Sequence, residues 1–459
     1  MQPKKQLSLF DLSMIVVSLV IGMGIFRTPV NVASKAQIPE LFFLAWIIGG
    51  LVAYCGALIY AEIGSRFPVT GGYYKIFSTC YHPSVAFAIN GTVVLTNAAS
   101  MAGVTLIGSE YLSSVIFPPE MQTDFYRLIV AGSTILIFYC INLLGLKASS
   151  KVQNILTVIK ITLVLILICA IFFGGNAATI TPVFKTASGN LPVWSDYGRA
   201  LGICLIAVTF SFAGYTQTIN LGGEVKDAKK IIPKGIKMGL FIIILLYLLI
   251  NYAYVSVIGF EQLKTAHSIA AILAGKIFGP AGFTVLSAVI FLSVLGYVNV
   301  NLLSNPRAMF AMGEEKALPS VFAQKNKKTD VMVVSLTTFT ALVIITLFFA
   351  QTFDKIVNYS IILECIGTAS SAATLFILRR TTSHLDKNSI YMMKWYPVLP
   401  VLFISFYLFV GISIYQDDPS AAMNGLYIFI AFVIIYFISK LFNKKKEVAD
   451  AAEEGTAIK

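Results

Sequence analysis

Two breaks interrupt long apolar segments of the sequence, and both could bind a ligand through main-chain atoms. The first, at residues 21–26, reads I-G-M-G-I-F, and the second, at residues 210–215, reads F-S-F-A-G-Y. A break in an apolar helix frees backbone N–H and C=O groups. Within a membrane such groups are tolerated only where they line a cavity or meet a ligand. The breaks therefore predict a binding site built from backbone groups.

The two breaks would offer opposite polarities. A helix that begins near Met23 presents unpaired N–H groups and a partial positive charge, which suit a carboxylate. A helix that ends near Ser211 presents unpaired C=O groups, which suit an ammonium group. The candidate acceptors are the carbonyl groups of Ile21, Phe210, Ser211 and Ala213. In the alternative interpretation, Gly22 and Gly24 only permit close helix packing.

Two charged residues lie deep inside apolar segments. Lys160 is ~15 Å along its segment at 1.5 Å per residue, too far to reach the membrane surface easily. A charge at that depth is a candidate for function; in the alternative interpretation, Lys160 is a structural residue paired with a carboxylate. Glu364 lies in the middle of another segment, where an ionised carboxylate needs a cation or a proton. Three interpretations stay open for Glu364: it pairs with Lys160 or Arg27, it carries a coupled proton, or it faces a ligand side chain that is basic or hydroxylated.

The elements that must position these groups are membrane-spanning helices. Apolar residues make up 57% of the 459-residue chain and charged residues only 12%. A helix of ~20 residues crosses a ~30 Å hydrocarbon core. Twelve segments are long enough, at roughly 9–34, 40–66, 84–116, 125–145, 150–174, 197–222, 232–258, 278–312, 329–350, 355–379, 395–415 and 420–442. We expect an all-α integral membrane protein with 12 transmembrane helices in residues 1–443, followed by a disordered cytoplasmic tail at 444–459.

The basic residues indicate the topology. Lys and Arg cluster at 226–237, 316–328, 379–387 and 444–446, which predicts that both termini are cytoplasmic and that the chain is a multi-pass protein of the plasma (inner) membrane. The net charge of +12 is then a topology signal and no sign of nucleic-acid binding. No Cys/His cluster, paired carboxylate or nucleotide-binding loop is evident, so we expect no metal, no cofactor and no enzymatic activity.

Five motifs, in the same order, resemble the amino acid–polyamine–organocation (APC) superfamily. They are the break at 21–26; G-G-L-V-A-Y-C-G-A-L-I-Y-A-E-I-G at 49–64; Pro68 followed by G-G-Y at 71–73; V-Q-N-I-L-T-V-I-K at 152–160; and the stretch from Leu292 through Arg307 to Ser320. The last two resemble its L-type amino acid transporter branch. The resemblance covers roughly residues 7–380.

The resemblance implies an APC (LeuT-type) fold, in which five helices are related to the next five as an inverted repeat. The repeats would be ~9–174 and ~197–379, with helices 1 and 6 broken around the substrate and helices 11 and 12 (~395–442) outside the repeat. It further implies a sodium-independent exchanger of small or medium neutral L-amino acids that works by alternating access. The alternatives are a proton-coupled symporter, a transporter of basic amino acids or amines, and a transporter-like nutrient sensor.

The resemblance also assigns roles to individual residues. Backbone N–H groups of Met23, Gly24 and Ile25 would receive the carboxylate, and Phe210 would close over the substrate. Lys160 would occupy the region of a sodium site in sodium-coupled cousins and would reach helix eight at Asn301 or Tyr297. The expected substrate-binding set is Ile21, Gly22, Met23, Gly24, Ile25, Phe210, Ser211, Phe212, Ala213, Tyr215 and Thr216. Phe210 is thus an expected gate, and position alone suggests three more. Arg27, just past the first break, is either an outer gate or a surface residue, and Glu62 and Arg307, near the cytoplasmic ends of helices two and eight, are expected in an inner gate network.

Glu364 departs from the family pattern, because neutral L-type relatives have an uncharged polar residue there. Tyr215 departs too, because many L-type relatives have tryptophan at its position. The expected partners are a small amino acid substrate and the lipid bilayer. A disulfide-linked ancillary subunit, as animal L-type relatives have, is not expected, because the loop between the third and fourth segments contains no cysteine.

Overall fold

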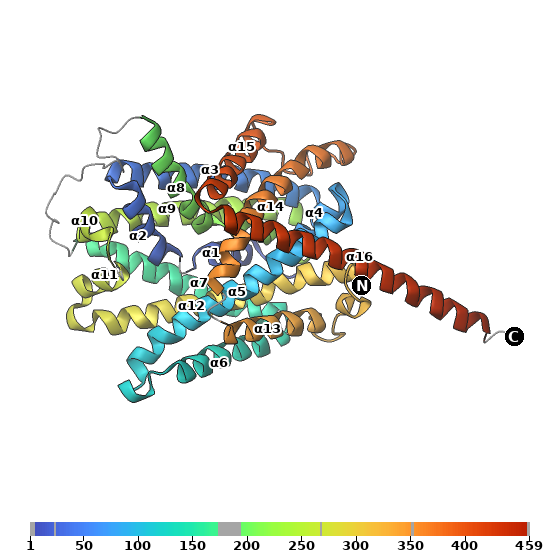
Figure 1. Cartoon of the computed structure of the whole chain (residues 1–459), viewed down its shortest axis with the longest axis horizontal. Coiled ribbons are helices and arrows are strands. Elements are labelled where there is room, and N and C mark those ends of the chain that lie inside the picture. The colour runs from blue at the N-terminus through green and yellow to red at the C-terminus, as the bar shows by residue number, and fades with distance from the viewer. Residues whose placement is uncertain (1–4, 23, 173–193, 267–268, 350–352, 457–459) are drawn as a thin grey trace.

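A computed structural model describes residues 5–22, 24–172, 194–266, 269–349 and 353–456. These residues form a bundle of helices, and their only β pairing is two isolated bridges, Leu7 with Val225 and Thr70 with Leu221. In Figure 1 the N-terminus and α4 lie at the right of the bundle, whereas α2, α10 and α11 lie at the left.

The long helices follow the predicted segments closely. They are α1 (Leu9–Val20), α2 (Gly24–Ala36), α3 (Pro39–Arg66), α5 (Pro83–Ile116), α6 (Asp124–Leu143), α7 (Leu146–Ile168), α8 (Trp194–Phe212), α9 (Ala228–Ile258), α12 (Gly282–Glu314), α13 (Val333–Phe348), α14 (Phe353–Thr381), α15 (Val398–Asp417) and α16 (Pro419–Thr456). The shorter ones are α4 (Gly72–Cys80), α10 (Phe260–Leu263) and α11 (Ile269–Phe278).

The described helices support a multi-pass membrane protein. Ten are long and apolar enough to cross a membrane, and the bent pair α1 and α2 makes up to 11. The ninth predicted segment corresponds to α13, whose 16 residues are apolar but shorter than a full span. Twelve spans therefore stay a prediction. At the other end, α16 continues as helix to Thr456, so it enters the region where composition predicts a disordered tail.

Long and short helices follow the same order in the two halves of the chain. A broken first segment and a long second helix are followed by the short helix α4 in the first half, and by α10 and α11 in the second. Three further long helices complete each half: α5, α6 and α7 in the first, and α12, α13 and α14 in the second. This order is what an internal repeat produces, although the inverted symmetry itself stays a prediction.

The two breaks differ in form. At the first, α1 ends at Val20, α2 begins at Gly24, and the two helices are inclined by 44°. At the second, α8 ends at Phe212 and the chain continues as a 3-10 helix, η3 (Tyr215–Asn220). Gly214 between them has φ +103°, and a Cβ there would lie 2.5 Å from the Leu19 carbonyl oxygen. Only glycine allows this close approach of the second break to α1.

Packing of large apolar residues holds the breaks in the middle of the bundle. α1 packs against α7, α9 and α12, while α2 packs against α8. Beside the second break, the rings of Trp46, Phe212 and Tyr247 pack on one another with centroid separations of 5.0–6.0 Å. All three residues are fully buried or nearly so. This aromatic cluster fixes the end of α8 against α3 and α9.

Candidate functional site

A cavity of about 550 Å³ lies between the two breaks. Its walls come from α2, α5, α8, α12 and α14, together with the ends of the breaks. Of the residues expected in the site, it is lined by Gly22, Gly24, Arg27, Phe210, Ser211, Ala213, Tyr297, Asn301 and Glu364. Exposed residues of α2, among them Ser34 and Lys35, also line it. The cavity therefore reaches the surface along α2, on the side away from the N-terminus (Figure 1).

The first break presents N–H donors near this cavity. The N–H groups of Gly24 and Ile25 lie in the first turn of α2, where no intrahelical acceptor exists for them. The Gly22 N–H donates to the Val20 carbonyl at 2.9 Å, so it is already engaged. Met23 lies outside the described residues. A carboxylate at the start of α2 would meet the N–H donors of that first turn.

Lys160 joins the first break to α12. Its Nζ, on the fully buried side chain, donates to the Ile21 carbonyl at 2.6 Å and lies 3.4 Å from the Ser18 hydroxyl. That hydroxyl donates in turn to the Gly296 carbonyl of α12 at 3.2 Å. Among the described residues Lys160 makes no ion pair with a carboxylate. The Lys160 ammonium group thus donates to the Ile21 carbonyl, which the break has freed from the helical hydrogen-bond pattern.

The structure places the helix-eight contact differently from the expectation. We expected Asn301 or Tyr297 to receive Lys160, but the link passes through Ser18 to Gly296. The Asn301 amide instead donates to the Tyr297 carbonyl at 2.9 Å, and the Tyr297 hydroxyl lies 3.0 Å from that of Ser100 on α5. Position 296 lies directly beside this link, since a Cβ there would lie 3.3 Å from the Ser18 hydroxyl oxygen and 3.5 Å from the end of the Lys160 side chain.

Tyr247 of α9 contacts the main chain of both breaks. Its hydroxyl lies 3.2 Å from the Val20 carbonyl and 3.3 Å from the Ser211 carbonyl. A second link is made by the Ser211 hydroxyl, which donates to Thr28 of α2 at 2.9 Å. Since a carbonyl oxygen accepts two hydrogen bonds, Ser211 could still receive a ligand ammonium. The breaks are therefore held together from one side and open to the cavity on the other.

Several residues expected in the binding set lie elsewhere. Ile25 and Phe212 are buried away from the cavity lining, and Ile21 contributes its carbonyl to Lys160. Tyr215 is also buried, with its ring 5.8 Å from that of Tyr60 and its hydroxyl against Gly56. Thr216 lines a smaller neighbouring cavity. Phe210, by contrast, is 41% exposed in the main cavity, where a closing aromatic residue would have to lie.

Glu364 lines the main cavity but pairs with no cation. Among the described residues, no Lys, Arg or His nitrogen lies within 4.0 Å of its carboxylate, so the expected pairing with Lys160 or Arg27 is not present. Lys160 is engaged by Ile21, and Arg27 is exposed at the cavity wall. The proton-carrying and ligand-facing interpretations remain.

Glu62 and Arg307 lie in separate ion-pair clusters at the N-terminal side of the bundle. The Glu62 carboxylate, on a fully buried side chain, receives Arg66 at 2.7 Å, Arg379 at 2.7 and 2.8 Å, and the Met393 N–H at 2.8 Å. This cluster ties α3 to α14 and to the segment that follows it. Burial, with the Tyr54 and Glu62 charges as smaller causes, raises the pKa of Tyr391 in that segment.

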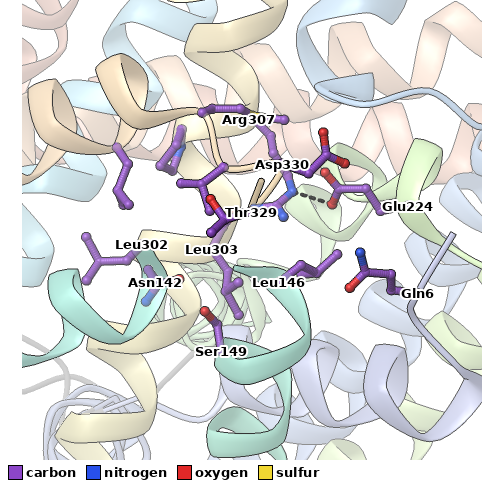
Figure 2. A pocket seen from close by; sticks show the side chains of 14 residues that line it. Gln6, Asn142, Leu146, Ser149, Glu224, Leu302, Leu303, Arg307, Thr329 and Asp330 are labelled. Atoms are coloured by element: carbon purple, nitrogen blue, oxygen red, sulfur yellow. Dashed lines mark hydrogen bonds and ion pairs between the residues drawn. The ribbon is translucent and has the colours of Figure 1, made fainter. Parts of the chain in front are cut away.

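The second cluster joins α12 to the N-terminus. Arg307 donates to the Glu224 carboxylate at 2.6 Å, as the dashed line in Figure 2 shows. The Glu224 carbonyl accepts the N–H groups of Gln6 and Leu7 at 2.8 and 3.0 Å. Arg307, Glu224 and Asp330 all line one small cavity of about 40 Å³. Glu224 therefore connects the chain beyond the second break to α12 and to the start of the chain.

The described residues contain no group of three or more His, Cys, Asp or Glu side chains that could hold a metal ion. The cysteines are all free thiols, and they are Cys55, Cys80, Cys140, Cys169, Cys204 and Cys365. Cys204 lines the main cavity, with its sulfur 3.6 Å from the Val32 carbonyl oxygen. The polar groups at the site are thus main-chain atoms, hydroxyls, amides and a few charged side chains, which suit reversible binding.

The sequence model of the amino acid permease family matches residues 7–439. The chain belongs to this family. It is similar to the serine/threonine exchanger SteT of Bacillus subtilis, with 27% identity over 92% of this chain and 94% of that protein. It is also similar to the large neutral amino acids transporter small subunit 2 of Oryctolagus cuniculus, with 25% identity over 96% and 82%, and to the human Asc-type amino acid transporter 1, with 23% identity over 96% and 83%.

Membership of the permease family supports amino acid transport and the APC superfamily resemblance seen in the motifs. The sequence reasoning missed Ser18, Tyr247 and Gly296, which hold the two breaks in place, and Glu224, which pairs with Arg307 at the N-terminal side. A serine or tyrosine in an apolar helix is common, so its type alone gives no signal. Glu224 was detectable, because it is an acidic residue at the end of a broken segment, within a basic cluster.

Proposed function

We propose that the protein exchanges small and medium neutral L-amino acids across the plasma membrane by alternating access, with no requirement for sodium and with both termini in the cytoplasm. The observation that carries this proposal is the Lys160 ammonium bound to the Ile21 carbonyl at the first break. A fixed cation there supplies the positive charge that a bound metal ion would supply to the freed carbonyl group.

Recognition of the amino acid would rest on both breaks. The substrate carboxylate would accept hydrogen bonds from N–H groups at the start of α2, and its ammonium group would donate to carbonyls near Ser211. Since both ends of the substrate meet main-chain atoms, every α-amino acid offers the same recognition element. The side chain would then lie in the cavity beyond, where Phe210 lies in position to close over it.

Exchange would follow if the site has to hold an amino acid whenever its access changes from one side of the membrane to the other. Two ion-pair clusters, around Glu62 and around Glu224 with Arg307, close the N-terminal side while the cavity reaches the surface along α2. Opening the other side would separate these pairs. The bound amino acid would stabilise the intermediate state, so return of the empty protein would be slower than return of the loaded one.

The experiment is uptake of radiolabelled amino acids into proteoliposomes that contain the purified protein. We expect uptake to require an internal amino acid and to be unchanged when choline replaces sodium. Amino acid esters and N-acetyl derivatives should not compete, because each lacks one charged end. An ester that competes as well as the free amino acid would exclude the carboxylate site at the start of α2.

A second candidate function is proton-coupled symport, favoured by the unpaired Glu364 carboxylate beside the cavity. It predicts accumulation driven by a pH gradient without internal amino acid, in the same liposomes. A nutrient sensor, the third class considered, would bind amino acids without moving them. Labelled substrate bound to the protein but never found in the lumen would favour that class.

A further inference from the structure

A smaller cavity of about 60 Å³ lies beside the main one. The two cavities share four lining residues: Thr96, Asn97, Gln217 and Glu364. The smaller cavity extends from them between α4, α5, η3 and α14. These four polar residues therefore form the passage between the space where the substrate backbone would lie and a side cavity beyond it.

Two hydrogen-bond acceptors at this passage lack donors. The Glu364 carboxylate makes no ion pair or hydrogen bond with the other described residues. The Gln217 Oε1 atom is buried and has no hydrogen-bond partner. A buried acceptor without a donor costs about 1–3 kcal/mol, and more when it is charged. A ligand group with several N–H donors and a positive charge would satisfy both residues.

The positively charged side chains near the passage do not compensate the charge of Glu364. Lys160 is bound to the Ile21 carbonyl and the Ser18 hydroxyl. Arg27 and Lys35 line the main cavity from α2, but both are exposed and neither forms an ion pair with Glu364. The cavity wall thus presents a negative charge at a place where the described residues supply no compensating cation.

The size of the side cavity limits what can enter it. A water molecule needs about 10–15 Å³ measured in this way, so 60 Å³ accommodates about four to six groups of that size. The apolar part of its lining includes Ile89, Val93 and Leu363, and hydroxyl groups of Thr92, Thr216 and Thr368 also belong to the lining residues. A short aliphatic chain that ends in an amine or guanidine fits this combination, since the methylene groups contact the apolar wall and the cationic end meets the carboxylate.

We propose that this side cavity is a subsite for a cationic substrate side chain, with Glu364 as its counter-charge and Gln217 as a second acceptor. The proposal rests on the proposed function, because the same main-chain groups would bind the α-amino and α-carboxylate groups. The substrate range then extends from neutral amino acids to those with an ammonium or guanidinium group at the end of a short chain.

The test uses ornithine and norleucine, which have side chains of equal length but end in an ammonium and a methyl group. Each is measured as a competitor of labelled amino acid exchange in proteoliposomes. We expect ornithine to compete at least about 10-fold better than norleucine, because a charge-assisted hydrogen bond in a desolvated site is worth about 1.5–3 kcal/mol. Equal competition, or better competition by norleucine, would overturn the subsite.

Variants assign the preference to the residues named. In Glu364→Gln the ornithine-to-norleucine ratio should fall at least about 10-fold, and in Glu364→Asp it should fall less, because the charge is retained. Gln217→Met should lower the ratio about 2- to 10-fold, since a neutral acceptor is lost. Glu110→Gln removes an exposed carboxylate of α5 and serves as the matched control. A ratio is used so that losses common to both competitors cancel.

The outcomes separate this subsite from the proposed function. If neither norleucine nor any neutral amino acid is exchanged, the proposed function fails. If neutral exchange is present but Glu364→Gln leaves the ratio unchanged, the subsite fails while the function stands. If that variant keeps the ratio but abolishes pH-driven accumulation, Glu364 is a proton carrier and the subsite is again excluded.

Discussion

Buried charged side chains are paired at the N-terminal side of the bundle but unpaired at the central cavity. At the N-terminal side, Glu62 is bound by Arg66 and Arg379, and Glu224 is bound by Arg307. At the cavity wall, Glu364 has no cation within 4.0 Å among the described residues. The paired charges hold helices together, whereas the unpaired carboxylate of Glu364 is available to a ligand.

This difference indicates which regions serve closure and which serve binding. A buried pair contributes little net stability, but removing one partner is costly because the other charge is left buried. The same cost applies in the cavity until a ligand arrives, so the unpaired groups there favour the bound state. Four substitutions test this comparison, from the largest expected effect to the smallest.

Glu62→Gln should have the largest effect on stability. It leaves Arg66 and Arg379 facing a neutral amide, and loss of one partner of a buried pair typically costs about 3–5 kcal/mol. The measurement is the melting temperature of the purified protein in detergent. Glu261→Gln, in the partly exposed pair with Lys264, is the control and should cost at most about 1 kcal/mol. Equal melting temperatures for the two variants would show that the cluster does not hold this side closed.

Lys160→Ala should act on transport more than on stability. The Ile21 carbonyl loses its charged donor, and a bond of that type is worth about 1.5–3 kcal/mol, which corresponds to a loss of exchange of about 10- to 100-fold. Exchange of labelled amino acid and melting temperature are measured together. Lys151→Ala changes an exposed lysine of the same helix and is the control. Full exchange activity in Lys160→Ala would remove the cation from the mechanism.

Gly214→Ala tests the close approach of the second break to α1. The residue has φ +103°, and the new Cβ would lie 2.5 Å from the Leu19 carbonyl oxygen, so we expect a cost of about 1–3 kcal/mol and slower exchange. Gly198→Ala is the control, because no atom lies within 4 Å of a Cβ at that position of α8. If Gly214→Ala melts and transports as Gly198→Ala does, the contact between the breaks is dispensable.

Tyr247→Phe should have the smallest effect. It removes the hydroxyl that lies near the Val20 and Ser211 carbonyls, and one neutral hydrogen bond contributes about 0.5–1.5 kcal/mol. Tyr254→Phe is a close control on the same helix, because the Tyr254 hydroxyl is buried without a partner. We expect a lower melting temperature for Tyr247→Phe only. A larger decrease for Tyr254→Phe would contradict this assignment.

The sequence predicted the local features of this molecule better than its side-chain pairs. The first break was predictable, because Gly22 and Gly24 interrupt an apolar run and α1 and α2 end and begin there. The depth of Lys160 in its segment was predictable from helix geometry, and its Nζ contacts the Ile21 carbonyl of the first break, whereas its role in transport stays a prediction.

The pairs joining distant segments could not be read from the chain. Glu62 and Arg307 were both expected at the inner gate, but the structure pairs Glu62 with Arg66 and with Arg379, which lies 317 residues away in the sequence. Several arginines and lysines on that side could have reached Glu62, and only tertiary packing selects among them. The same holds for Ser18 with Gly296, where the acceptor is a carbonyl group that every residue has.

The Lys160 contact has a consequence for energetics. A dissolved ion bound to such a carbonyl group can dissociate on the other side of the membrane. The gradient of that ion then contributes free energy to transport. The Lys160 ammonium is part of the chain, and as long as it keeps its proton it returns with the protein in every cycle. Lys160 is therefore not a transported ion and does not count in the ratio of ions to amino acids moved in each cycle. In the proposed exchanger Lys160 contributes no driving force, so the amino acid pools on the two sides would set the direction of net flux.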